Sequence, residues 1–157
     1  MQNNEVSLKK MRRMLFGLGL VKIPIIGFVK PKLMMLDDHI GQVRIRLRRR
    51  TRNHLNSMYF GALAVGADVA AGLHAFYFAN KMGKKVSFAF KGMDAEFLRR
   101  AESDVTFTSS EGPLVEAAMK KSAETGERVN QEIMVLATDE DGEEVAKFKM
   151  IVSVKVK

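Results

Sequence analysis

One acidic side chain stands alone in a long apolar segment of the sequence. Asp68 is the only Asp or Glu between residues 57 and 79. Burial of a lone carboxylate raises its pKa unless hydrogen bonds or a cation compensate. Beside an apolar pocket, such a group can act as a general base toward water or as a nucleophile on a carbonyl. A structural hydrogen-bonding role and a role in orienting a ligand are the alternatives.

The segment that carries Asp68 is expected to be one buried helix. Residues 57–79 are apolar nearly all round, which is typical of a helix that is covered on several sides. Ser57 can cap its start, and Gly83 fits the left-handed position that ends many helices. At 1.5 Å per residue the helix is roughly 34 Å long, so a curved sheet is needed to cover it.

Alternation of apolar and polar residues predicts strands before and after this helix. Before it, residues 39–50 place Val43, Ile45 and Leu47 on one face and arginines on the other. After it, the strand patterns cover residues 85–97, 104–108, 128–138 and 144–156. An Asp-Gly turn joins the last two strands, and residues 113–125 predict a second, short helix. We therefore predict an α+β fold in which an antiparallel sheet wraps around a long central helix.

The positive charge of the chain is concentrated in its first third. Residues 1–52 hold 13 Lys or Arg against three Asp or Glu, and residues 53–157 hold 13 against 15. This charge can serve nucleic acid, an anionic membrane surface or the phosphates of a nucleotide-bearing substrate. Nucleic acid is the least favoured, because no aromatic residues alternate with Arg44, Arg46 and Arg48. A solvated sheet surface is the plainer interpretation of those arginines.

Residues 14–29 are apolar but do not predict a transmembrane helix. Lys22 and Pro24 interrupt the run, which is too short to span a bilayer, and no signal-peptide cleavage pattern follows it. We expect residues 1–32 to form an N-terminal helical extension that covers part of the core, with membrane-surface contact left open. Residues 33–157 are expected to form the main domain.

Composition excludes several kinds of chemistry. The sequence of 157 residues has no cysteine, so disulfides, thiolate nucleophiles and Cys-ligated metals are excluded. His39, His54 and His74 show no metal-ligand spacing, and no dinucleotide or phosphate-loop motif is present, so no metal or cofactor is expected. A cytoplasmic location is expected.

A motif at the predicted helix start carries a family resemblance. Residues 53–61 read Asn-His-Leu-Asn-Ser-Met-Tyr-Phe-Gly. The stretch resembles the Asn-x-x-Gly-x-x-His-Gly-Gly motif of hotdog-fold acyl-CoA thioesterases similar to the phenylacetic-acid-pathway enzyme, with a carboxylate nine residues beyond the His. Asn53, Gly61 and Asp68 are in register with that pattern. Tyr59 and Phe60 replace the His and the first Gly, as in a less characterised hotdog subgroup whose helix starts with Tyr-Phe-Gly.

The resemblance implies a homodimer, or a tetramer, that hydrolyses an acyl-CoA or acyl-carrier thioester. Asp68 would be the catalytic carboxylate, and backbone N–H groups at Phe60 and Gly61 would stabilise the oxyanion. The resemblance also implies substrate-binding roles for Asn53, Tyr59, Arg99 and Arg100. For Asn53 a local cap is an equal alternative, and for the two arginines a solvated strand end is the alternative.

Helix geometry adds a constraint to this hypothesis. Phe60 and Asp68 are eight residues apart, or roughly 12 Å along one helix, so a single chain cannot offer both to one carbonyl. Two antiparallel helices related by a two-fold axis could do so. Because Tyr59 and Phe60 depart from the family pattern, a non-catalytic acyl- or lipid-binding hotdog module is the alternative function.

Overall fold

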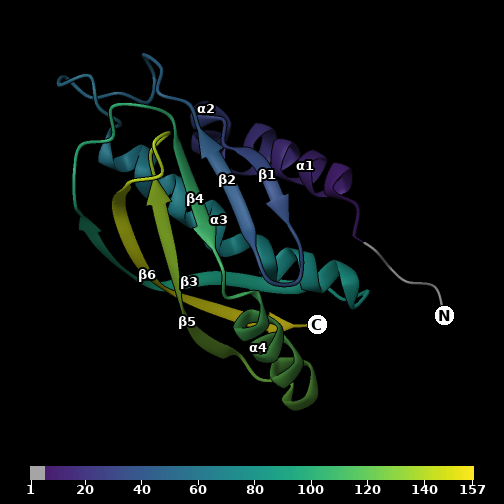
Figure 1. Cartoon of the computed structure of the whole chain (residues 1–157). Helices are drawn as coiled ribbons and strands as arrows, with labels where there is room; N and C mark the ends of the chain where they lie inside the picture. Colours follow the sequence, from purple (N-terminus) through teal and green to yellow (C-terminus); the bar gives the residue numbers. More distant parts are fainter. Residues whose placement is uncertain (1–5) are drawn as a thin grey trace.

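A computed structural model describes residues 6–157 as a six-stranded antiparallel sheet with helices on one face and at one edge (Figure 1). The strands are β1 (Lys32–Leu36), β2 (Gly41–Ile45), β3 (Val86–Phe97), β4 (Val105–Ser109), β5 (Val129–Thr138) and β6 (Glu144–Val156). The helices are α1 (Leu8–Gly17), the π-helix η1 (Leu18–Lys22), α2 (Pro24–Val29), α3 (Phe60–Lys81) and α4 (Gly112–Thr125). The strand order is β1-β2-β4-β5-β6-β3, so β1 and β3 are the two edges.

The long helix α3 runs across the concave face of the sheet (Figure 1). Its side chains pack against the inward-facing residues of the strands, among them the fully buried Phe107 and Phe148. At Gly66 the packing is so close that an added Cβ would lie 2.3 Å from the Phe107 ring. The predicted α+β class, with an antiparallel sheet wrapped around a central helix, is confirmed, and the arrangement is the hotdog fold.

One stripe of α3 is left partly open by the sheet. Gly61, Ala64, Val65, Asp68 and Phe76 are only half-buried, whereas most other residues of the helix are buried. In a helix with 3.6 residues per turn, these five positions fall on one face. In a single chain this stripe is the part of α3 that lacks a covering layer.

The N-terminal segment folds back on itself beside β1. The guanidinium Nε of Arg12 donates a hydrogen bond to the carbonyl oxygen of Leu33, 3.1 Å away. The backbones of η1 and α2 touch at Gly19 and Gly27, where an added Cβ on Gly27 would lie 2.3 Å from the Gly19 oxygen. The side chains of this segment that enter the core are Met11, Leu15, Ile26 and Val29.

Several local predictions are confirmed. Gly83 at the end of α3 and Gly142 in the hairpin between β5 and β6 have positive φ angles of 64° and 81°. Gly126, which follows α4, has a φ of 71°. The short helix predicted near residue 113 is α4, which carries Pro in its first turn. Each of these positions needs the left-handed or fixed backbone that Gly or Pro supplies.

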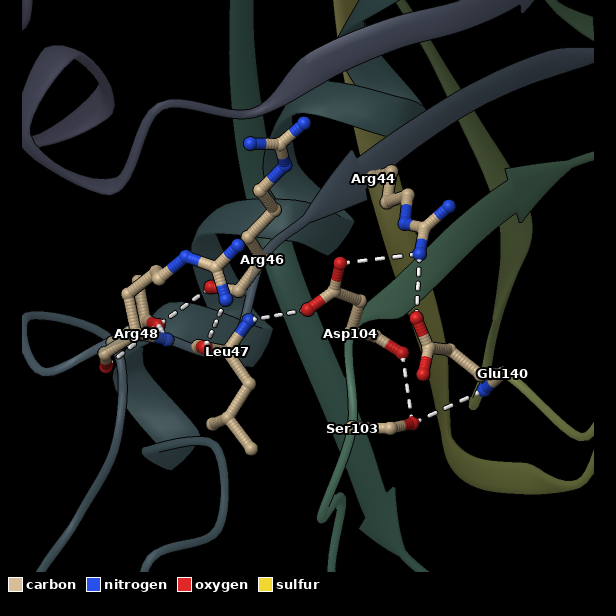
Figure 2. Close-up of polar contacts among 8 residues, drawn as sticks. Arg44, Arg46, Leu47, Arg48, Ser103, Asp104 and Glu140 are labelled. Carbon is tan, nitrogen blue, oxygen red and sulfur yellow. Dashed lines mark hydrogen bonds and ion pairs between the residues drawn. The ribbon is translucent and has the colours of Figure 1, made fainter.

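Two element boundaries were predicted wrongly. The strand predicted for residues 39–50 ends at Ile45, because the N–H of Leu47 donates to the Asp104 carboxylate at 2.9 Å instead of to a neighbouring strand (Figure 2). The central helix begins at Phe60, and Ser57 does not cap it. The Ser57 hydroxyl donates to the side-chain oxygen of Asn53 at 3.2 Å. The edge strand β1 was not predicted.

Among the described helices, α3 is long and apolar enough to cross a membrane by length and composition alone. However, 83% of its most apolar stretch is buried inside the fold. The segment at residues 14–29, for which no transmembrane helix was predicted, forms parts of three short helices. The apolar character of α3 is therefore explained by its place in the core.

The contact between Gly66 and Phe107 makes a stability prediction. We expect Gly66→Ala to lower the free energy of unfolding by about 1–3 kcal/mol, because the clash with a buried ring exceeds the helix propensity that Ala adds. Gly17→Ala is the matched control, since nothing lies within 4 Å of its added Cβ, and it should be neutral or stabilising by up to about 1 kcal/mol. Urea denaturation measures both. Equal stability of the two variants would show that α3 is not packed this closely.

Candidate functional site

A cleft of about 540 Å³ lies where the start of α3 meets the segment that follows β3. Five of the predicted substrate-binding residues line it: Asn53, Tyr59, Phe60, Arg99 and Arg100. Gly61 and Asp68 do not line it, because they lie farther along the open stripe of α3. The fold thus brings together residues that are about 40 positions apart in the sequence.

Asn53 organises the loop that leads into the helix. Its side-chain oxygen accepts hydrogen bonds from the N–H groups of Leu55 at 2.9 Å and Ser57 at 3.2 Å, and from the Ser57 hydroxyl. Asn56 in the same loop adopts a left-handed backbone with φ of 60°. These bonds are those of a local cap, which was one of the two roles that the sequence left open. Asn53 also forms part of the cleft wall.

The start of α3 offers unpaired backbone donors. The N–H groups of Ala62 and Leu63 both reach the carbonyl oxygen of Tyr59, at 2.9 and 3.1 Å. Within residues 6–157, the N–H groups of Phe60 and Gly61 have no acceptor. Free donors at a helix N-terminus are aligned with the helix dipole and can stabilise an anion.

The Tyr59 ring explains why a glycine follows Phe60. An added Cβ on Gly61 would lie 2.5 Å from the ring of Tyr59, so any larger residue would displace that ring. The Tyr59 side chain remains half exposed at the cleft. Tyr59, which replaces the His of the family motif, therefore covers the first turn of the helix.

Aromatic side chains form one wall of the cleft. Phe60 is 60% exposed, and its ring centroid lies 4.8 Å from that of Tyr59 and 6.3 Å from that of Phe97. Phe97 in turn contacts the buried ring of Phe148 at 6.0 Å. Phe97 and the adjacent Leu98 were not predicted as site residues, although their apolar character just before Arg99 and Arg100 was a signal for it. This wall can take an apolar chain or an aromatic group.

The two arginines of the cleft differ in their surroundings. Arg99 makes an exposed ion pair with Glu143, with 3.3 Å between Nη1 and Oε2. Within the described part of the chain, Arg100 has no ion-pair partner. An exposed pair of this kind contributes little to stability, so both guanidinium groups remain accessible to an anionic ligand.

Asp68 is a carboxylate without compensating partners. Burial raises its pKa to about 6 from the ordinary 3.8. No cation or hydrogen bond in the described chain lowers that pKa again. A carboxylate that titrates near pH 6 is a stronger base than an ordinary Asp and is still mostly ionised at neutral pH. Its position on the open stripe of α3 leaves it facing whatever covers that stripe.

The histidines lie away from the cleft or at its rim. His74 is fully buried, its Nε2 lies 3.1 Å from the carbonyl oxygen of Asp37, and burial lowers its pKa, so the ring is neutral at pH 7. His54 lines the cleft and is exposed. In the part of the chain that the structure describes, no group of three or more His, Asp or Glu side chains could hold a metal ion.

Comparison with known proteins agrees with this fold. The chain belongs to the family described as Domain of unknown function (DUF4442), whose model matches residues 12–154. Among curated proteins, no sequence matches it.

Three solved structures show the same architecture at low sequence identity. A protein of unknown function from Chlorobaculum tepidum TLS is 9% identical, with a TM-score of 0.84 over 98% of this chain and 99% of that one. A "putative thioesterase" from Shewanella oneidensis is 12% identical, with a TM-score of 0.81 over 94% and 99%. A thioesterase from Haemophilus influenzae is 10% identical, with a TM-score of 0.67 over 97% and 92%. These likenesses define the hotdog fold of the chain.

The raised pKa of Asp68 makes a pH-dependent stability prediction. The folded protein keeps the Asp68 proton up to about pH 6, whereas the unfolded chain releases it near pH 3.8. This carboxylate therefore lowers the free energy of unfolding as the pH rises through that window. We expect Asp68→Asn to be more stable than the wild type by up to about 3 kcal/mol at pH 7.5 and by nothing near pH 3.5. Urea denaturation of both proteins across this range measures the difference, and a difference independent of pH would contradict the raised pKa.

Proposed function

We propose that the protein hydrolyses an acyl-CoA or acyl-carrier thioester at the interface of a homodimer. The observation that carries the proposal is Asp68, a half-buried carboxylate with a pKa of about 6, on the open stripe of the helix whose first turn holds free N–H donors. The names of the Shewanella and Haemophilus proteins, which share the fold, support the reaction class.

The distance between the two functional groups supports a dimer. Asp68 and Phe60 are separated by two turns of the unbroken helix α3, or roughly 12 Å. One carbonyl can meet both groups only if a second copy supplies one of them. If Asp68 of one subunit faces Phe60 and Gly61 of the partner on antiparallel helices, the two-fold axis passes near Ala64, midway between them.

Two features of the single chain support this arrangement. The stripe of α3 around Ala64 consists mainly of small or apolar side chains, which allow helices to approach closely. Among residues 6–157, strand β3 pairs only with β6, so its other edge presents 12 residues of backbone to a second copy. Pairing of the β3 edges would place the two α3 helices next to each other across the axis.

In the proposed reaction, Asp68 of one subunit removes a proton from water as the water oxygen attacks the thioester carbonyl carbon. The negative charge that develops on the carbonyl oxygen is stabilised by the N–H groups of Phe60 and Gly61 of the partner subunit. The C–S bond then breaks, the thiolate takes up the proton that Asp68 removed from water, and the products are a carboxylic acid and a free thiol, with Asp68 ionised again. The ring of Tyr59 packs against the turn that carries these donors.

The cleft provides places for the two ends of the substrate. The aromatic wall of Phe60 and Phe97 would hold the acyl group. Arg99 and Arg100 would hold the phosphates of the carrier. Asn53 keeps the connecting loop in shape and can orient the thioester.

A non-catalytic acyl- or lipid-binding module is the second candidate function. Phe60 favours it, because this side chain stands where the family motif has Gly and is more than half exposed in the cleft. Such a module would bind the same acyl-CoA molecules without releasing the thiol.

Turnover by the wild type and by Asp68→Asn distinguishes the two functions. We expect the wild type to hydrolyse at least one member of a panel of short, medium, long and aromatic acyl-CoAs. For that substrate kcat/KM should rise with pH through about 6, because the base must be ionised. Asp68→Asn should lower kcat on the order of 10²–10⁴-fold, because it removes the general base. Release of free thiol, followed with a thiol reagent, measures the rate.

The matched control for that experiment is Glu124→Gln, an exposed carboxylate on α4 that lies outside both the cleft and the β3 edge. It should leave kcat unchanged. Binding of acyl-CoA without thiol release by the wild type would favour the binding module, and turnover that survives Asp68→Asn would exclude the catalytic role of this residue.

The position of the two-fold axis makes a separate prediction. We expect Ala64→Gln to weaken the dimer and lower turnover together, because the two copies of the larger polar side chain would meet at the axis. Ala117→Gln on the exposed face of α4 is the matched control and should change neither property. Light scattering across a dilution series measures the dimer. A wild-type dimer that Ala64→Gln leaves intact would place the interface elsewhere.

A further inference from the structure

The α1–η1–α2 segment carries apolar side chains on two faces. One face enters the core, as described above. The other is exposed to solvent, with Phe16 at 72%, Val21 at 75% and Leu20 at 68% of full exposure. The remaining large apolar side chains of this outer face are Ile23, Ile25 and Phe28. So many exposed large apolar side chains along one short segment are typical of a binding interface rather than of free solvent.

The charge around this apolar face has one sign. Residues 6–36 contain seven Lys or Arg and no Asp or Glu. Several of these cations, among them Arg12, Arg13 and Lys22, are exposed next to the apolar side chains in the same helices. Exposed apolar side chains flanked by Lys and Arg are the pattern of helices that lie in the interface of an anionic membrane.

A cationic cleft continues from the end of α2 across the outer face of the sheet. Its volume is about 470 Å³. Six of its lining residues are cations: Lys30, Lys32, Arg44, Arg46, Arg48 and Arg50. Val29 and Lys30 connect it to the apolar face, because they end and follow α2. Lys30 reaches this position through a left-handed backbone with φ of 56°.

Only one arginine of the cleft is neutralised within the fold. Arg44 contacts Asp104 at 3.1 Å and Glu140 at 2.7 Å (Figure 2). Figure 2 shows the guanidinium of Arg46 pointing away from these carboxylates, and that of Arg48 bonded only to the carbonyl oxygen of Leu47. In residues 6–157 neither of these two, nor Arg50, has an ion-pair partner. Unpaired cations gathered in one cleft repel one another until an anion binds.

The register of the sheet brings a further cation to this cleft. Lys32 of β1 lies directly opposite Arg44 of β2, whose charge is already balanced by Asp104 and Glu140. Lys32 lines the same cleft as Arg46 and Arg48, so an anionic group bound there would reduce the repulsion among these cations.

The place of this surface in the fold keeps it available in the proposed dimer. The cleft crosses β1 and β2, at the edge of the sheet farthest from β3. The α1–η1–α2 segment packs beside the same edge (Figure 1). A partner that pairs through β3 would cover neither of them.

We propose that this surface binds the interface of an anionic phospholipid membrane. The exposed side chains of α1, η1 and α2 enter the acyl region, and the cleft cations from Lys30 to Arg50 hold lipid phosphate groups. Charge complementarity commits the surface to anionic lipid, because an apolar protein partner would not need the cations and a soluble anion would not need the apolar face. Membrane binding of this kind would not require hydrolytic activity.

Vesicle flotation with the full chain tests the proposal. The wild type should float with phosphatidylcholine vesicles that contain one quarter phosphatidylglycerol, and not with pure phosphatidylcholine. Two triple variants should each weaken this binding on the order of tenfold or more: Arg46→Gln/Arg48→Gln/Arg50→Gln and Phe16→Ser/Leu20→Ser/Phe28→Ser. Salt screens the cations, so added salt should weaken wild-type binding and reduce the difference between the wild type and the arginine variant. The difference between the wild type and the apolar variant should persist.

Lys121→Gln/Lys155→Gln/Lys157→Gln is the control, because it removes the same charge from exposed positions on the C-terminal side of the fold. It should bind like the wild type, and thermal unfolding should show that all three variants are folded. Equal binding to both vesicle types, equal weakening by the control, or no binding by the folded wild type would overturn the proposal. A change of oligomeric mass in the Phe16 variant without vesicle binding would overturn it in favour of a protein interface, and RNA binding without vesicle binding would overturn it in favour of nucleic acid.

Discussion

The fold depends on how a helix that is apolar nearly all round is kept from water. The sheet covers most of α3, and close contacts such as that of Gly66 with the Phe107 ring hold the helix against the sheet. One stripe remains open, and it carries Asp68 between small and apolar residues. In a single chain the apolar side chains of this stripe are only partly removed from water. Partial burial among them raises the pKa of Asp68 to about 6.

The same constraint connects fold and proposed chemistry. A rigid helix holds its first-turn donors and its carboxylate two turns apart, so neither can drift toward the other within one molecule. A second copy would bury the stripe of α3. The same interface would bring the carboxylate of one subunit to the N–H donors of the other. The N-terminal helices and the arginine cleft lie at the other edge of the sheet, so their proposed membrane contact and the proposed dimer can coexist.

Regular patterns in the sequence predicted the helices and strands that depend on local sequence. The element boundaries that were predicted wrongly are set by contacts that the patterns do not contain. The helix was predicted from a long run that is apolar nearly all round, and the strands after it were predicted from alternation of apolar and polar residues. The end of β2 was not, because the N–H of Leu47 goes to Asp104, 57 residues away. Likewise the Asn53 contacts that displace the helix start belong to a loop without periodicity. Five residues that line the cleft were predicted. Phe97 and Leu98 were missed, because they reach the cleft only at the far end of the long strand β3.

The central claim, that Asp68 of one chain faces the helix start of another, has a direct test in a sequence without cysteine. If the two-fold axis passes near Ala64, a single Ala64→Cys substitution places two thiols opposite each other, and mild oxidation should give a covalent dimer in high yield. Phe76→Cys, on the same stripe but 12 residues from the axis, should give none. Cross-linking of Phe76→Cys but not of Ala64→Cys, measured by intact mass at low protein concentration, would contradict the account.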